Sequence, residues 1–155
     1  MAVPKKTLSY LDKNKIKYEV VEHKTVFTAY DLAQTLKMKL PEIAKTLLVK
    51  VDKNLALTVI PASLRLDFAS LKKIAKAKKV SIPKENVMKT KLKIKPGAIT
   101  PFGQLYKIPV YLDSALKRQS KILVGSGSFE ESIKMTPAGL IKLEEPTIGK
   151  ISKKK

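Results

Sequence analysis

Lys45 stands directly before residues 46–51, a run of threonine, leucine and valine broken only by Lys50, which predicts a β-strand. Successive side chains of a strand point to opposite faces, so Lys45 shares a face with Leu47 and Val49. A lysine at the mouth of a strand, in register with apolar residues, tends to point into a cleft, where its charge suits an anionic ligand. The alternative is an ordinary solvated lysine. We take Lys45 as the first candidate functional residue.

The second candidate is the loop at residues 96–103, which combines two glycines with two prolines. Glycine lets the backbone approach a ligand closely, and proline stiffens the chain beside it. In such a loop the amides of Ala98 and Ile99 can donate hydrogen bonds to an oxyanion, an arrangement worth several kcal/mol when it is preorganised. The alternative is a simple turn, since many Gly/Pro loops have no further role.

Gly125, Ser126 and Gly127 follow a predicted strand at residues 121–124. Small residues at the end of a strand can form an anion-binding nest of backbone amides. The segment is not a Walker loop, because no Gly-Lys-Ser/Thr follows, and it is not a dinucleotide fingerprint. It predicts at most an anion site.

Classical catalytic groups are scarce in the chain. His23 is the only histidine, and a lone histidine is more often structural than catalytic. No serine lies in a nucleophile elbow, and no Ser/His/Asp set is evident. The absence of cysteine excludes disulfides and thiolate catalysis, and the 13 acidic residues form no cluster spaced for a metal. We therefore expect any reaction to proceed without a metal or cofactor.

Charge is the strongest compositional signal, with 32 lysines and arginines against 13 acidic residues and a formal net charge of +19. Such a field attracts polyanions. All but Arg65 and Arg118 are lysines, which neutralise phosphates but read bases poorly. A nucleic-acid partner is the favoured interpretation, and a surface that is merely kept soluble is the alternative. No secretory signal or membrane-spanning run is evident, so we expect a cytoplasmic protein.

The elements that would position these residues alternate between helix and strand. Helices are predicted at residues 4–14, 68–78 and after the N-cap residues Thr28 and Thr136, and a helical turn at Pro41. Strands are predicted at residues 18–22, 46–51, 55–60, 108–112, 121–124 and 132–135, with a hairpin at 52–54 and an irregular stretch at 80–104. We expect one α+β (mixed α/β) domain over residues 1–150 with a central sheet. Residues 151–155 would be a basic tail, with its end at 152–155 frayed.

In order and spacing, these features resemble the YbaK/ProX family, which includes the inserted editing domain of bacterial prolyl-tRNA synthetases. The resemblance runs from about Leu8 to Leu143 and rests on six short segments. They are His23 with Thr28-Ala29 and Leu32-Ala33; Lys45-Thr46-Leu47; Pro61-Ala62 with Leu66-Asp67 and Leu71; the GxxxP loop at Gly97 to Pro101 with Phe102-Gly103; Pro109-Val110 with Asp113; and Gly125 to Gly127.

This resemblance implies a mixed, partly barrel-like sheet flanked by helices. It also implies a free-standing deacylase that hydrolyses alanyl- or cysteinyl-tRNA, notably on proline tRNA, with prolyl-tRNA synthetase as a further partner. Lys45 would contact the tRNA acceptor end, while the backbone of Gly97, Ala98 and Ile99 would hold the ester carbonyl. Water, or the substrate's own thiol, would attack with help from the tRNA ribose. The other substrate-binding residues implied are Thr46, Pro101, His23, Gly125, Ser126, Gly127 and Ser132.

Two departures from the family pattern bear on specificity. Ser132 stands where the cysteine-selective branch carries an acidic residue, and the glycine turn continues into Ser128 and Phe129 where relatives often have basic residues. The preference between alanine and cysteine therefore stays open. The alternatives to an editing enzyme are an inactive tRNA-binding module of the same fold and an unrelated basic RNA-binding protein.

Overall fold

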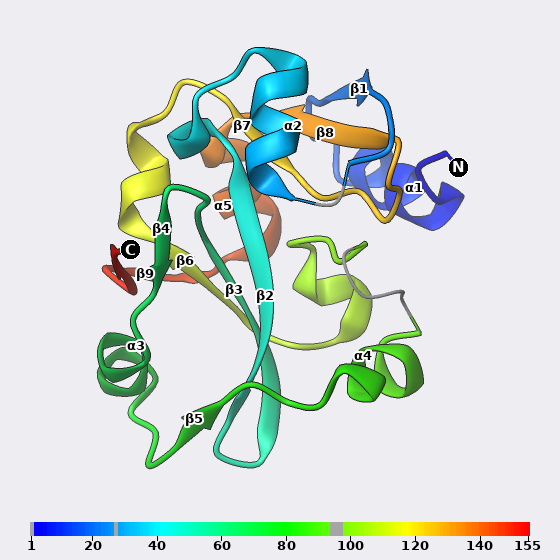
Figure 1. Ribbon diagram of the computed structural model, residues 1–155. Coiled ribbons are helices and arrows are strands. Elements are labelled where there is room, and N and C mark those ends of the chain that lie inside the picture. The colour runs from blue at the N-terminus through cyan, green and yellow to red at the C-terminus, as the bar shows by residue number, and fades with distance from the viewer. Residues whose placement is uncertain (1, 27, 94–97) are drawn as a thin grey trace.

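The computed structural model describes residues 2–26, 28–93 and 98–155 (Figure 1). It is a mixed α+β structure, as the sequence predicts. A five-stranded sheet has the order β5-β2-β3-β6-β9, in which β2 (Ala44–Val51) and β3 (Asn54–Pro61) form the expected antiparallel hairpin. The strands β6 (Val110–Asp113) and β9 (Thr147–Gly149) continue it in parallel, while β5 (Val80–Ser81) covers only the far end of β2.

A three-stranded sheet lies beside the start of β2, with β8 (Glu131–Met135) paired between β1 (Glu19–Glu22) and β7 (Ile122–Val124). An isolated parallel bridge between Ile43 and Leu123 connects the two sheets. Within the described ranges the strands do not close into a barrel.

Side-chain caps begin several of the helices. In α2 (Ala29–Leu36) the hydroxyl of Thr28 accepts a hydrogen bond from the Asp31 amide at 3.0 Å, and in α5 (Pro137–Glu144) Thr136 accepts from Gly139 at 3.0 Å. Both caps were expected from the sequence. The remaining helices are α1 (Lys5–Lys13), α3 (Phe68–Ala75) and α4 (Glu85–Lys91), with short 3-10 helices at Leu40–Glu42, Gly103–Tyr106 and Ser114–Arg118.

The stretch at residues 80–104 is less irregular than the sequence suggests, because it contains β5, α4 and the start of a 3-10 helix. Helix α4 is only seven residues long and none of its residues is fully buried. Its apolar contribution is limited to Val87 and Met88, which pack on the core. Two apolar residues on one turn give too weak a periodicity to mark a helix.

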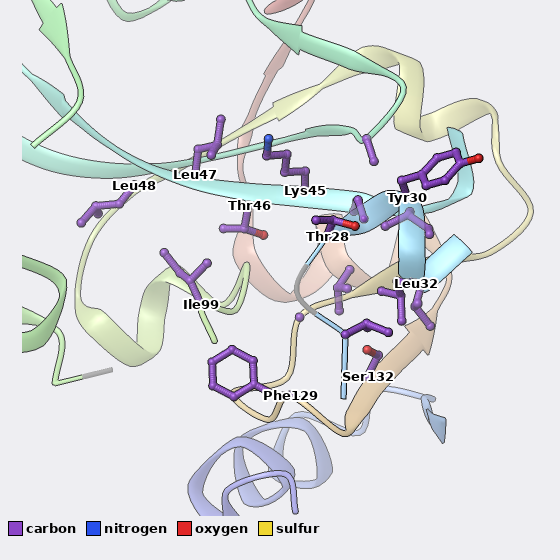
Figure 2. Close-up of a pocket in the computed structure, with 18 of the residues that line it drawn as sticks. Thr28, Tyr30, Leu32, Lys45, Thr46, Leu47, Leu48, Ile99, Phe129 and Ser132 are labelled. Carbon is purple, nitrogen blue, oxygen red and sulfur yellow. The ribbon is translucent and has the colours of Figure 1, made fainter. Parts of the chain in front are cut away.

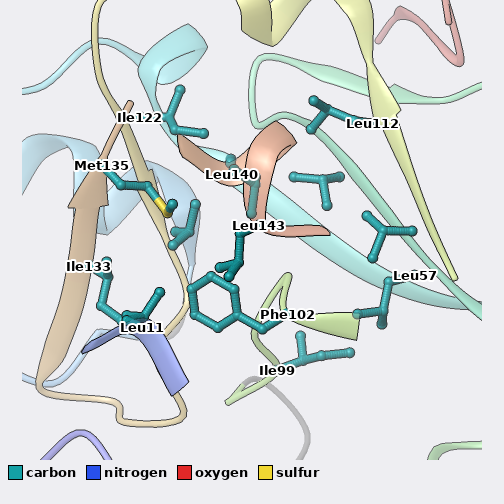
Figure 3. Packing of buried hydrophobic residues seen from close by; sticks show 14 of the residues in the cluster. Leu11, Leu57, Ile99, Phe102, Leu112, Ile122, Ile133, Met135, Leu140 and Leu143 are labelled. Atoms are coloured by element: carbon teal, nitrogen blue, oxygen red, sulfur yellow. The ribbon is translucent and has the colours of Figure 1, made fainter. Parts of the chain in front are cut away.

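The main core lies between the two sheets, under α1 and α5 (Figure 3). Phe102, at the end of the predicted GxxxP loop, is fully buried there, and its ring lies edge-on to Tyr10 with centroids 6.0 Å apart. A smaller cluster forms where α2 covers the bridge between the sheets, through Ala33, Ile43, Ala62 and Leu123. Helix α2 is therefore packed over the bridge that connects the two sheets.

The sequence predicts a frayed basic end at residues 152–155, and this prediction is wrong for residues 152–154. Ser152–Lys154 form strand β10, which pairs antiparallel with β4 (Leu64–Leu66). Ile151 is buried, and the Asp113 carboxylate accepts hydrogen bonds from the Ile151 amide and the Ser152 hydroxyl, each at 2.8 Å. None of the described helices is long and apolar enough to cross a membrane.

Candidate functional site

A cavity lies beside β2, where one edge of this strand has no strand partner among the described residues over part of its length. On one edge, β3 pairs with β2 from Ala44 to Val51. On the other edge, β5 pairs only with the last two residues of β2, and the bridge to β7 lies just before its first residue. Between these points, residues 44–49 have no strand partner on that edge within the described ranges. A cavity of about 720 Å³ lies here, within the usual size range of small-molecule sites (Figure 2).

Lys45 and Thr46 lie on opposite faces of β2 at this cavity, as the alternation of a strand requires. Figure 2 shows Lys45 on the same side as Leu47, which confirms the predicted register, while Thr46 points toward the side that carries Ser132. Lys45 is exposed and lines the cavity wall. The Thr46 hydroxyl oxygen is shielded from solvent and has no hydrogen-bond partner among the described residues.

The loop at residues 98–103 is buried and packed against the glycine turn. Ile99 lines the cavity, and its carbonyl oxygen lies where a side chain on Gly125 would be, so this position must be glycine. The Tyr106 phenol braces the loop, with its oxygen 2.8 Å from the Thr100 hydroxyl. Ala98 and Pro101 are buried but do not line this cavity, and Gly97 lies outside the described residues.

In the glycine turn, one backbone amide that an anion nest could use is already hydrogen-bonded. The Ser126 hydroxyl donates to the Glu131 carbonyl at 2.6 Å and accepts from the Ser128 amide at 3.2 Å, which occupies an amide that such a nest would need. Gly127 has φ of +95°, a conformation that favours glycine. Gly125 lines the cavity, whereas Ser126 and Gly127 do not.

His23 and Ser132, 109 positions apart in the chain, meet at the cavity wall. The histidine Nε2 lies 2.8 Å from the Ser132 hydroxyl oxygen, and its Nδ1 lies 2.8 Å from the Lys24 carbonyl oxygen. Ser132 is 6% exposed. The sequence shows both residues but gives no sign of this contact, because no local pattern connects strands so far apart in the chain.

The mouth of the cavity is basic and partly apolar. Lys45 is joined there by Lys84 and Lys155, while Glu85 is the acid among the lining residues. The Tyr30 ring is 59% exposed at the rim. Reasoning from the sequence missed Tyr30, Lys84 and Lys155, since an exposed tyrosine and two lysines in a lysine-rich chain carry no distinctive signal.

A buried acid, Glu144, supports the base of the loop. Its carboxylate accepts hydrogen bonds from the Tyr10 hydroxyl at 2.5 Å and from the Gln104 amide at 3.0 Å. Burial raises the pKa of the Glu144 carboxyl above its ordinary value, although both hydrogen bonds act in the opposite direction. These two hydrogen bonds to Glu144 connect α5 with α1 and with the 3-10 helix at Gly103–Tyr106.

Known proteins share this sequence pattern and fold. Residues 23–143 match the family model of the aminoacyl-tRNA editing domain. The proline–tRNA ligase of Macrococcus caseolyticus (strain JCSC5402) is 30% identical over 108 residues, which make up 70% of this chain but 19% of that enzyme.

Two solved structures at 20% identity share the fold. Hypothetical protein APE2540 gives a TM-score of 0.89 over 96% of this chain and 100% of that one. A candidate trans-editing enzyme for prolyl tRNA synthetase gives 0.83 over 96% of both chains. At this identity the two structures support the architecture alone.

Proposed function

Because this chain belongs to the aminoacyl-tRNA editing domain family, we propose that it acts in trans to hydrolyse the ester of tRNA charged with the wrong small amino acid. The family makes it an aminoacyl-tRNA deacylase, a hydrolase of a carboxylic ester. The substrates that we assign are alanine or cysteine attached to proline tRNA. This assignment extends the resemblance to prolyl-tRNA synthetase editing domains, with that synthetase as the source of the mischarged tRNA and the cytoplasm as the setting.

One observation carries this proposal: Lys45, Thr46 and Ile99 all line a single cavity, with Lys45 and Thr46 on opposite faces of the strand that borders it (Figure 2). An aminoacyl-tRNA end has phosphates, a ribose and an ester carbonyl close together. A lysine suits the phosphate or ribose side, and rigid backbone groups suit the carbonyl. The packing of Ile99 on Gly125 gives the loop the rigidity that such positioning needs.

The cavity mouth suits the single-stranded acceptor end. Lys45, Lys84 and Lys155 supply positive charge for its phosphates, and the exposed ring of Tyr30 offers a surface on which a base can stack. A volume of about 720 Å³ exceeds what a small aminoacyl group needs, so we assign the remainder to the terminal nucleotide. Recognition would then depend mostly on the common end of tRNA.

The test is a deacylation assay on one proline tRNA charged in turn with alanine, cysteine and proline. We expect release of alanine and cysteine, with prolyl-tRNA spared. Ser132 is neutral, so a cysteine thiol gains no charge-assisted hydrogen bond from it, and we expect alanine to be released at least as fast as cysteine. Tight tRNA binding without release of any amino acid would instead identify a binding module that has lost catalysis.

A further inference from the structure

Strands β4 and β10 cover one face of the β2–β3 hairpin. Leu66 of β4 and Ile151, directly before β10, belong to one hydrophobic cluster against which Leu47 of β2 packs. Lys45 lies on the same side of β2 as Leu47 (Figure 2). The small β4–β10 sheet therefore lies on the side of β2 toward which Lys45 points.

The outer face of the β4–β10 sheet is basic. Leu66 and Ser152 form a buried pair of this ladder. The next pair, Arg65 and Lys153, therefore points to the opposite face, and both residues are exposed. Like charges in directly opposite positions destabilise a strand pair. No carboxylate in the described part of the chain forms an ion pair with either cation, so a bound anion would relieve this repulsion.

Arg65 is held in a way that suits a phosphate. Its Nε donates to the Lys154 carbonyl at 3.1 Å, and its two terminal nitrogens have no hydrogen-bond partner among the described residues. A guanidinium is planar and can donate two parallel hydrogen bonds to a phosphate. The contact with β10 therefore holds the guanidinium in place and leaves donors for an anion.

Asp67, two residues after Arg65, is occupied by helix α3. Its carboxylate accepts hydrogen bonds from the Ala69 and Ser70 amides and from the Ser70 hydroxyl. The hydrogen bonds from Ser70 lower the pKa of Asp67 most, and the charge of Lys153 lowers it further. Lys153 thus interacts with Asp67 beyond ion-pair distance, and its ammonium remains available to a second anion.

Lys155 connects this basic face with the cavity. It follows β10 directly and lines the cavity mouth together with Lys45. It is two residues from Lys153, a step of at most about 7 Å along the chain. Lys45, Lys155, Lys153 and Arg65 therefore form a row of positive charge that begins at the cavity and ends on the outer face of the β4–β10 sheet. We call these four residues the basic row.

We propose that the outer face of the β4–β10 sheet binds phosphates of the tRNA acceptor stem while the aminoacyl end occupies the cavity. This inference rests on the proposed function for the identity of the RNA. A tRNA held by its end must leave through the cavity mouth, and the basic row offers its backbone a path of matching charge from there. Contacts of cations with phosphates position a nucleic acid without reading its bases, so this face contributes affinity and not tRNA identity.

The first experiment measures the affinity for proline tRNA as a function of salt. Arg65→Gln/Lys153→Gln removes the two cations of the basic row that do not line the cavity. If each neutralises one phosphate, at roughly 0.7–0.9 per phosphate, the slope of log affinity against log salt should fall by about 1.4–1.8. Arg65→Lys keeps the charge and should keep most of the slope, which distinguishes lost charge from a damaged strand.

The matched control is Lys13→Gln/Lys17→Gln, which removes the same charge from two exposed lysines outside the cavity. They lie at the end of α1 and shortly after it, and Figure 1 shows α1 on the opposite side of the molecule from the C-terminal end. This control should retain the wild-type slope. Equal slopes for the two double variants would overturn the proposed face.

The second experiment varies the length of the RNA. One substrate is alanine on a minihelix with the acceptor stem of proline tRNA, and the other is alanine on the terminal CCA trinucleotide alone. On the minihelix, Arg65→Gln/Lys153→Gln should raise KM by about tenfold at unchanged kcat, the sign of lost uniform binding. On the trinucleotide, which ends before the stem, it should match wild type. An equal loss on both substrates would overturn the proposal, because the variant would then act on the cavity itself.

Failure of this inference can be told apart from failure of the proposed function. Binding of proline tRNA that depends on Arg65 and Lys153, without release of any amino acid, would leave the face standing and remove the deacylase. Release of alanine that is equally fast in the double variant at every salt concentration would remove the face and leave the deacylase standing. Normal tRNA binding by the double variant, with loss of binding to vesicles that contain phosphatidylserine, would assign the face to a lipid surface and overturn the proposal.

Discussion

The carbonyl oxygen of Ile99 lies in the space that a side chain on Gly125 would fill. The two predicted features of the site, the GxxxP loop and the glycine turn, therefore form one packed unit. Ile99, a residue of the cavity wall, can take this position only because residue 125 has no β-carbon.

Gly125→Ala should accordingly damage both stability and activity. The new methyl group would force the Ile99 carbonyl away, and overpacking of this kind costs about 1–3 kcal/mol. We expect a lower urea midpoint and a deacylation rate reduced beyond what the unfolded fraction explains. Gly139→Ala is the comparison, because its methyl group would meet the capping hydroxyl of Thr136 at 3.2 Å, a tight contact but one far milder than the overlap with the Ile99 carbonyl at Gly125. An active Gly125→Ala protein of normal stability would show that the contact has no role.

Thr46→Val should separate stability from function. The Thr46 hydroxyl is buried without a described partner, so its removal should leave stability unchanged or raise it by about 1 kcal/mol. The loss of one hydrogen bond to the substrate should lower kcat/KM by about two- to tenfold.

Thr58→Val is the matched control for Thr46→Val on the neighbouring strand. Its hydroxyl donates to the Leu47 carbonyl at 3.2 Å, so its loss should cost about 1 kcal/mol with little effect on turnover. If Thr46→Val destabilises the protein as much as Thr58→Val does, the Thr46 hydroxyl has a structural partner and is not reserved for substrate.

Affinity for tRNA should depend steeply on salt, because lysines at the cavity mouth would displace counterions from phosphates. Replacing Lys45, Lys84 and Lys155 together with alanine should reduce the slope of log affinity against log salt by about 2–3, or roughly 0.7–0.9 for each phosphate that is no longer neutralised. The control replaces three exposed lysines outside the cavity, Lys72, Lys73 and Lys117. Equal slopes for the two triple variants would show that charge acts through the whole surface and not at this mouth.

Glu144 should make stability depend on pH. Its folded pKa is raised above the ordinary value of 4.5, so the native state holds more protons than the unfolded state between those two values. The resulting stabilisation is complete below about pH 4.5 and is lost as the pH rises through the folded pKa. In Glu144→Gln this pH dependence is absent, and the amide can still pair with Tyr10 and Gln104.

Urea unfolding of both proteins from about pH 4 to 7 isolates the Glu144 contribution, since the other groups are common to both. The difference in free energy of unfolding should shift in favour of Glu144→Gln as the pH rises. A difference that stays constant across this range would contradict the burial-driven shift.

Local signals explain what the sequence could predict. Thr28 and Thr136 mark helix starts because a capping hydroxyl acts within three residues of itself, and the strand alternation places Lys45 with Leu47. Contacts between distant segments carried no such signal. Strand β10 is rich in lysine, and only its pairing with β4 and the Asp113 carboxylate explain why it is ordered.

The same difference between local signals and long-range contacts applies to the residues of the site. The positions of Lys45 at a strand mouth and of Ile99 in a rigid loop, and the family resemblance at Thr46, predict ligand-binding roles, and the three residues line one cavity. The contact of His23 with Ser132 could not be predicted, because it depends on how β1 pairs with β8. Four other residues that the resemblance implies, Ala98, Pro101, Ser126 and Gly127, do not line this cavity.

The most direct measurement is the rate of alanine release from proline tRNA by wild-type protein, Lys45→Ala and Lys50→Ala. Lys50 is the matched control, since it is an exposed lysine of the same strand that does not line the cavity. We expect rapid release by wild type and Lys50→Ala, and a loss of about 100-fold in Lys45→Ala, or about 2.7 kcal/mol of barrier, at unchanged melting temperature. No release by the wild type, or a folded Lys45→Ala protein as active as Lys50→Ala, would contradict the assignment of this cavity as the editing site.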